Sequence, residues 1–159
     1  MVPVFLPFLY PRLGFDPLRD LAPVAMLTSF NFALAVRADH PARDLPGFIA
    51  WIRAQGDRAS CGSLSANTPA RFLGVLFNRS TGKRIEHVPY RGAAPMVLAL
   101  LRGEIPAGFT TTASLMPQLQ DGSVRALAVT GGSRSPLLPQ VPRFAEIGLD
   151  LGEMSAAEM

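Results

Sequence analysis

The stretch His87-Val88-Pro89-Tyr90-Arg91-Gly92-Ala93-Ala94-Pro95 has the residue types of a small-anion site. The residues before Tyr90 are typical of a short strand, and those after Ala94 of an apolar helix with a proline in its first turn. The unpaired N–H groups at a helix start favour a carboxylate or a phosphate. Arg91 adds a cation that can contact an anion through two hydrogen bonds, although a lone arginine beside a turn is more often simply solvated.

Two other polar loops follow strand-like segments in the same way. In Ser63–Thr68, hydroxyl groups and backbone amides can hold a ligand carboxylate, and Asn67 can adopt the left-handed conformation that a tight anion-binding turn often needs. Thr110–Thr112 offers further hydroxyl donors ahead of a helix. For both loops the alternative is structural: the hydroxyl groups only cap the following helix or complete a link from strand to helix.

The segments between these loops predict the elements that position them. Alternation over Phe32–Val36 predicts a strand, and the apolar face that follows Asp44, a typical N-cap, predicts a helix to about Gln55. Further strands are expected over 58–62, 84–88, 105–109 and 124–130, and further helices from 68, 95 and 114, each with a proline in its first turn. This alternation predicts an α/β fold with a parallel sheet.

Ligands of such sheets bind at the carboxyl ends of the strands, where all three polar loops are expected to meet. The candidate ligand-binding residues are Ser63, Ser65, Ala66, Asn67 and Thr68 of the first loop, Tyr90, Arg91, Gly92 and Ala93 of the second, and Thr110, Thr111 and Thr112 of the third.

Composition excludes several other kinds of protein. The 159 residues are 48% hydrophobic and 17% charged, as expected for one domain or one lobe with a buried core. The basic residues are scattered singly and the net charge is +3, so nucleic acid is not an expected partner. Cys61, the single cysteine, is expected to pack as a small apolar residue, and His87 to be structural. Neither a metal site nor a nucleotide-binding turn is present, so no cofactor is expected.

The stretch from His87 to Pro95 resembles the H-V-P-Y-K-G-x-x-P signature of the Bug-type solute receptors, the substrate-binding components of tripartite tricarboxylate transporters. The resemblance covers nearly the whole chain from about Phe5. Further matches occur in the same order along the chain, over Phe15–Val24, Leu100–Ile105, Gly122–Thr130, Arg134–Pro142 and Phe144–Leu149.

The resemblance implies a type II periplasmic-binding-protein-like fold, in which two lobes close on a small carboxylate solute, catalyse no reaction, and deliver the solute to membrane permease subunits. It also implies a periplasmic location, although Met1–Tyr10 lacks the basic start and the small-residue cleavage site of a signal peptide. Because family members are much longer, residues 24–132 are expected to form the second ligand-binding lobe. Residues 1–23 then correspond to a first-lobe remnant and hinge approach, and residues 133–159 to a truncated return hinge.

Two departures from the family pattern bear on the ligand. Ser65-Ala66-Asn67 replaces a glycine-rich run, and Phe109-Thr110-Thr111 stands where Phe-Asp-Asn is common. Without an acid at position 110, a plain mono- or dicarboxylate is a better expected ligand than an amino acid. Alternatives are a non-binding relic, the effector domain of a regulator, which would need a helix-turn-helix, and a small hydrolase, which would need a Gly-x-Ser-x-Gly turn.

Overall fold

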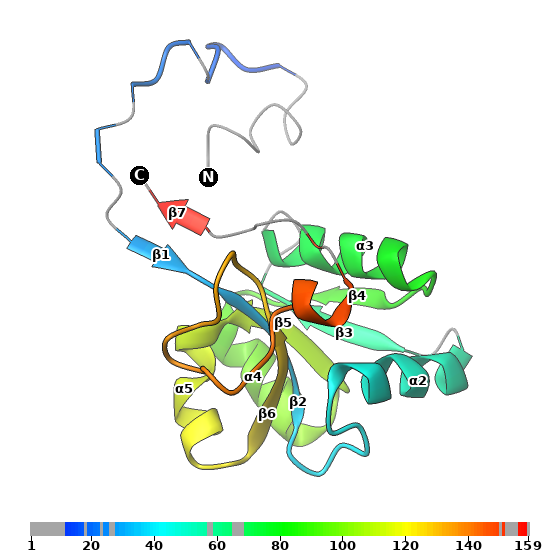
Figure 1. Ribbon diagram of the computed structural model, residues 1–159. Coiled ribbons are helices and arrows are strands. Elements are labelled where there is room, and N and C mark those ends of the chain that lie inside the picture. The colour runs from blue at the N-terminus through cyan, green and yellow to red at the C-terminus, as the bar shows by residue number, and fades with distance from the viewer. Residues whose placement is uncertain are drawn as a thin grey trace.

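The computed structural model in Figure 1 describes residues 12–17, 19–22, 24–25, 28–56, 59–64, 69–149, 151 and 156–158. A five-stranded sheet has helices on both faces, and a separate two-stranded pair lies apart from it. The elements in chain order are β1 (Thr28–Phe30), β2 (Phe32–Arg37), α2 (Leu45–Gln55), β3 (Ser60–Ser63), α3 (Pro69–Thr81), β4 (Glu86–Pro89), α4 (Ala93–Arg102), β5 (Ala107–Thr111), α5 (Thr112–Gln120), β6 (Val124–Val129), the 3-10 helix η2 (Ala145–Ile147) and β7 (Ala156–Glu158).

The sheet has the order β4-β3-β5-β2-β6. β3 pairs in parallel with both β4 and β5, whereas β2 is antiparallel to its neighbours β5 and β6. The predicted α/β class is therefore confirmed, as a mostly parallel sheet with one reversed strand. Because β2 is reversed, its first residue, Phe32, lies at the edge where β3, β5 and β6 end.

The two faces of the sheet carry separate hydrophobic clusters. On β2, Phe32, Leu34 and Val36 belong to the cluster under α2 and α3, and Ala33 and Ala35 to the cluster under α4 and α5. The period-two pattern of this strand thus separates two buried faces, with the large side chains on one and the small ones on the other.

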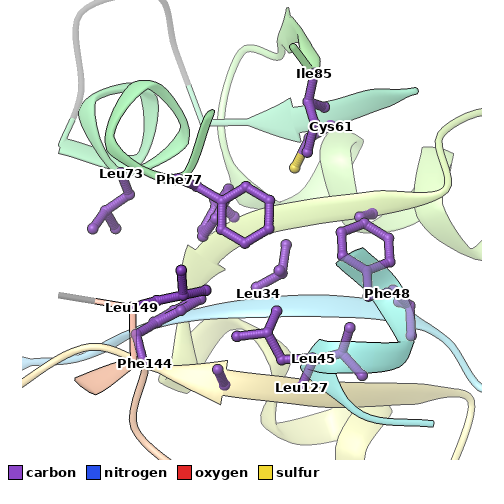
Figure 2. Packing of buried hydrophobic residues seen from close by; sticks show 14 of the residues in the cluster. Leu34, Leu45, Phe48, Cys61, Leu73, Phe77, Ile85, Leu127, Phe144 and Leu149 are labelled. Carbon is purple, nitrogen blue, oxygen red and sulfur yellow. The ribbon is translucent and has the colours of Figure 1, made fainter. Parts of the chain in front are cut away.

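Figure 2 shows the first cluster, which is organised around Phe77 of α3. The Phe77 ring lies 6.5 Å from Phe48 of α2, 6.1 Å from Phe109 of β5 and 6.4 Å from Phe144, measured between ring centroids. Each of these rings is almost fully buried. Burial of a large aromatic side chain contributes about 3 kcal/mol or more, so this cluster joins α2, α3, the sheet and the segment after β6.

Several predicted helix ends are found where expected, although α4 begins at Ala93, two residues before the expected Pro95. The Asp44 carboxylate accepts a hydrogen bond of 2.7 Å from the Gly47 N–H at the start of α2. Pro69 is the first residue of α3, and Gly103 ends α4 in the left-handed conformation at φ 72°. These are the residue types that favour each position, so local sequence is sufficient to place them.

The predicted loop at Thr110–Thr112 is wrong. Thr110 and Thr111 extend β5, pairing with Ala33 and Phe32 of β2, and Thr112 begins α5 without an intervening loop. Helix α5 consequently starts two residues before the expected Ser114, and Pro117 lies inside the helix instead of in its first turn. β-Branched threonines suit a strand, and here the pairing with β2 continues through them.

Helix α3 packs closely against β4 because Gly74 has no side chain. A Cβ atom at position 74 would overlap the His87 ring. Burial lowers the pKa of His87; the Gly74 backbone opposes this shift and the charge of Arg71 adds to it. Cys61, paired with His87 across the two strands, is fully buried, and burial raises the pKa of its thiol. Structural roles for both residues agree with the sequence-based expectation.

The segment after β6 is held back against the sheet. Phe144 N–H donates to the Val129 carbonyl at 3.0 Å. On the outside, the Glu146 carboxylate accepts hydrogen bonds from Arg134 at 2.6 and 3.0 Å and from Arg143 at 2.8 Å. The hydrogen bonds from Arg134 and Arg143 lower the pKa of Glu146 to about 2. This ionic cluster lies on the exposed side of the segment whose Phe144 ring is buried.

Replacing Gly74 with alanine tests the contact between α3 and β4. We expect Gly74→Ala to lower the free energy of unfolding by about 1–3 kcal/mol, because the new methyl group overlaps the His87 ring. In a His87→Ala background the same change should instead stabilise the protein by about 0.5–1 kcal/mol, the usual gain from alanine in a helix. Urea denaturation followed by circular dichroism measures both. Equal losses in the two backgrounds would contradict the contact.

Glu146 should make stability depend on acid pH. Its folded pKa of about 2 lies below the ordinary 4.5, so the ionised form favours the fold. This contribution is present above about pH 4.5 and is lost as the pH falls toward 2. Urea denaturation at pH 6 and pH 3 should therefore show a smaller acid loss for Glu146→Gln than for the unaltered chain. An identical acid loss in both proteins would rule out this role for Glu146.

Candidate functional site

The ends of β3, β4 and β5 lie side by side at the carboxyl edge of the parallel strands (Figure 1). Ser63 at the end of β3 pairs with Pro89 at the end of β4 and with Phe109 near the end of β5. Of the first predicted loop, Ser65, Ala66, Asn67 and Thr68 lie outside the described residues. Ser63 itself is a buried strand residue, and Leu64 packs against the first cluster. Among the described residues, the ends of β3, β4 and β5 are thus found at one edge, as predicted.

The turn from β4 to α4 is held by backbone hydrogen bonds to the segment after β3. Tyr90 N–H donates to the Ser63 carbonyl at 2.8 Å, and Gly92 N–H donates to the Leu64 carbonyl at 3.1 Å. Gly92 is the N-cap of α4 with φ at 111°, a conformation that glycine adopts far more readily than other residues. The β4–α4 turn is therefore fixed by its backbone.

The start of α4 has two properties of an anion site. Among the described residues, no side chain caps the helix, which is 10 residues long, and its first N–H groups carry partial positive charge. Arg91 is exposed and forms neither an ion pair nor a hydrogen bond with any other described residue. A cation and uncapped amide groups therefore occupy the same turn.

Tyr90 has a different place. It is partly buried and packs against the cluster under α4, and burial, with the charge of Glu104, raises its pKa. This position identifies the ring as a packing element of the turn.

Thr110 lies beneath the start of α4. Met96 of α4 packs directly on Gly62 and Gly108, where any Cβ atom would overlap it. Along β5, Thr110 is two residues beyond Gly108 on the same face, a rise of about 6.6 Å. Along α4, Gly92 lies about one helical turn before Met96, a rise of about 5.4 Å. The two similar rises place Thr110 beneath the helix start. The Thr110 side chain is fully buried, and its hydroxyl group has no hydrogen-bond partner within the described chain.

Thr111 and Thr112 serve the fold directly. The Thr111 hydroxyl caps α5 by accepting from Ser114 N–H at 3.3 Å, and it also lies 2.8 Å from the Ser114 hydroxyl. Thr112 is buried, and its N–H donates to the Asn31 carbonyl at 2.9 Å. The contacts of these two residues fit the structural alternative for the third loop, in which the residues cap the following helix or complete the link from strand to helix.

The same edge includes Asn31, Thr130 and Gly131, which were not predicted. Asn31 lies between β1 and β2, its side-chain oxygen 3.0 Å from the position of a Cβ at Gly131, and its amide group makes no hydrogen bond among the described residues. The Thr130 hydroxyl accepts from Phe32 N–H at 3.0 Å. The sequence gives no direct signal for this placement, because it depends on β2 running antiparallel to its neighbours.

A cavity of about 410 Å³ lies at the opposite edge, where β2 ends at Arg37. His40 lines it, with Nδ1 accepting from Ala42 N–H at 3.1 Å and the ring packed 4.7 Å from the Trp51 ring centroid. Burial lowers the pKa of His40. In the described part of the chain, no three His, Cys, Asp or Glu side chains gather as a metal site, and no helix has the length and apolarity to cross a membrane.

Comparison with known proteins agrees with this architecture. The family model described as "Tripartite tricarboxylate transporter family receptor" matches residues 1–159. BugT of Bordetella pertussis is 30% identical over 140 residues, which cover 88% of this chain and 43% of BugT. MatC of Rhodopseudomonas palustris, solved with bound malate, has 25% identity and a TM-score of 0.80 over 97% of this chain and 51% of its own.

A second solved protein of R. palustris, Rpa4515 with adipate, is 29% identical at a TM-score of 0.81, covering 92% of this chain and 49% of that one. The chain thus spans less than half the length of the first curated relatives it matches. The family is described as one of transporter receptors, and a solved neighbour of 33% identity is described as a periplasmic transporter. The family resemblance seen in the sequence is confirmed, and the chain belongs to the tripartite tricarboxylate transporter receptor family.

Proposed function

We propose that this chain provides one wall of a cleft that binds a small carboxylate solute in a transport receptor. The observation that carries the proposal is the uncapped start of α4 beside Arg91, which has no partner among the described residues. Malate and adipate, bound in two structurally similar proteins, are both dicarboxylates and support this ligand class.

The β4–α4 turn recognises one carboxylate group. The N–H groups of Ala93 and Ala94 point along the axis of α4 at its positive end and donate to the carboxylate oxygens. Arg91 donates charge-assisted hydrogen bonds to the same carboxylate from the solvent side of the turn. The proposed neighbouring wall is the segment Ser63–Thr68, whose first two residues, Ser63 and Leu64, accept backbone hydrogen bonds from Tyr90 and Gly92.

Thr110 defines the floor of this site and its preference for ligands. Its hydroxyl group is a buried donor without an acceptor among the described residues, and it becomes satisfied when ligand binding shifts the residues that cover it and brings a ligand oxygen or a bridging water within reach. Threonine carries no charge that would balance a ligand ammonium group. The site therefore favours plain mono- and dicarboxylates over amino acids.

Residues 24–132 form the second ligand-binding lobe in this proposal. Strands β1 and β7 pair with each other outside the main sheet, with Thr28 opposite Glu158 (Figure 1). In this proposal, residues 1–23 and 133–159 belong to the connections with a first lobe. Closure of the two lobes encloses the solute. The receptor acts in the periplasm, catalyses no reaction and delivers its solute to the membrane permease subunits of the transporter.

Binding of simple dicarboxylates by the chain tests the proposed function. Isothermal calorimetry should detect malate or adipate, and aspartate and glutamate should bind more weakly. Arg91→Gln should weaken dicarboxylate binding about ten-fold, the loss of one charge-assisted hydrogen bond. Arg53→Gln, which removes an equally exposed arginine from the last turn of α2, serves as the control and should bind normally. Failure to bind any dicarboxylate, or equal effects of both variants, would contradict the proposal.

Thr110→Val should have opposite effects on stability and on binding. Removing a buried hydroxyl group that has no partner should raise the free energy of unfolding by about 1 kcal/mol. The same substitution should weaken adipate binding, because the ligand loses a donor. Thr111→Val removes a helix cap and should instead cost about 1 kcal/mol of stability. Denaturation and calorimetry on both variants decide the matter, and unchanged adipate affinity in Thr110→Val would remove Thr110 from the site.

A further inference from the structure

Helix α3 and the turn that follows it carry a row of exposed basic side chains. Arg71 and Arg79 lie on the exposed side of α3, opposite the buried residues Leu73 and Phe77, and Lys83 and Arg84 continue the row into the turn before β4. The spacing from Arg71 to Arg79 is two steps of four residues, which keeps both on one side of the helix. We call Arg71, Arg79, Lys83 and Arg84 the basic corner.

The basic corner lacks the acidic partners found elsewhere on the chain. Among the described residues, the ion pairs join Arg37 to Asp39, Arg102 to Glu104, and both Arg134 and Arg143 to Glu146. None of the four corner residues takes part in an ion pair or side-chain hydrogen bond within the described chain. Their charge is therefore available to a partner. The next acid in sequence, Glu86 on β4, is exposed and forms no ion pair with them.

The backbone that presents the corner is rigidly held. The Asn78 side chain donates to the Ile85 carbonyl and accepts from Ile85 N–H, both at 3.0 Å. Lys83 N–H donates to the Asn78 carbonyl at 3.1 Å, and the Thr81 hydroxyl donates to the Phe77 carbonyl at 2.7 Å. A turn fixed in this way loses little conformational entropy when its charged groups bind.

The composition of the surface favours a protein partner. Val75, 51% exposed, lies between Arg71 and Arg79 on α3. Three of the four cations are arginine, whose planar guanidinium group binds carboxylates through two hydrogen bonds. A membrane-binding helix would instead present large apolar or aromatic side chains for insertion, and the exposed side of α3 presents one valine.

We propose that the basic corner docks an acidic protein surface, with the arginine side chains paired to clustered carboxylates and Val75 covered at the centre. The corner extends along α3 from Arg71, near the helix start that follows β3, to Lys83 and Arg84 at the opposite edge, where β4 begins. None of its four residues lies on α4, whose start carries the candidate solute site. The proposal does not depend on which solute the receptor binds.

Binding to a fluorescein-labelled peptide of alternating glutamate and glycine residues tests this proposal. The variant Arg71→Gln/Arg79→Gln/Lys83→Gln/Arg84→Gln is compared with Arg12→Gln/Arg19→Gln/Arg43→Gln/Arg53→Gln, which removes the same number of positive charges from other exposed positions. Fluorescence anisotropy at low salt should show a loss of affinity of about ten-fold or more in the corner variant and much less in the control. Circular dichroism confirms that both variants fold.

Equal losses in the two variants, or no binding of the peptide to the unaltered chain, would overturn the proposal, because net charge alone would then explain the result. Tighter binding to phosphatidylglycerol vesicles than to the peptide, lost in the corner variant, would also overturn it in favour of a membrane surface. If either fourfold variant fails to fold, the pairs Lys83→Gln/Arg84→Gln and Arg43→Gln/Arg53→Gln give the same comparison at two positions each.

Discussion

Strand β2 lies between β5 and β6 and is buried on both faces, with large side chains on one face and alanines on the other. Because of this difference in side-chain size, a helix can approach the sheet more closely on the alanine face. On the face of Ala33 and Ala35, Gly62 and Gly108 add no side chains, so Met96 of α4 packs directly on the sheet. The close approach of α4 brings its first turn down to the carboxyl edge, above Thr110. The position of the candidate site thus follows from the side-chain sizes on the sheet.

The chemistry at this edge relies on the backbone more than on charged side chains. The β4–α4 turn is fixed by hydrogen bonds to Ser63 and Leu64, and Gly92 supplies a conformation that leaves the helix start uncapped. Arg91 is the one cation in this turn. A site of this kind recognises the shape and charge of a carboxylate group through N–H donors.

Sequence alone was sufficient for several positions at which one residue type has a local preference. Asp44, Pro69 and Gly103 mark helix ends because their side chains or backbones favour those positions, and the His87–Pro95 stretch could be placed between a strand and a helix for the same reason. Thr110–Thr112 was predicted as a loop because nothing local indicates that β2 pairs with β5 through those residues. Asn31 was missed because its place at the site depends on the reversed direction of β2. The basic corner was missed because its basic residues share one side of the molecule only once α3 is formed.

The central claim is that a carboxylate ligand binds at the start of α4, at the carboxyl edge of the parallel strands. A titration of ¹⁵N-labelled chain with adipate, followed by two-dimensional nuclear magnetic resonance of the backbone amides, tests this claim most directly. The account predicts that the largest, saturable shifts occur at Arg91, Gly92, Ala93 and Ala94, with Thr110 also affected. Shifts concentrated at the opposite edge, around Arg37 and Gly103, or no saturable shift at any amide group, would contradict it.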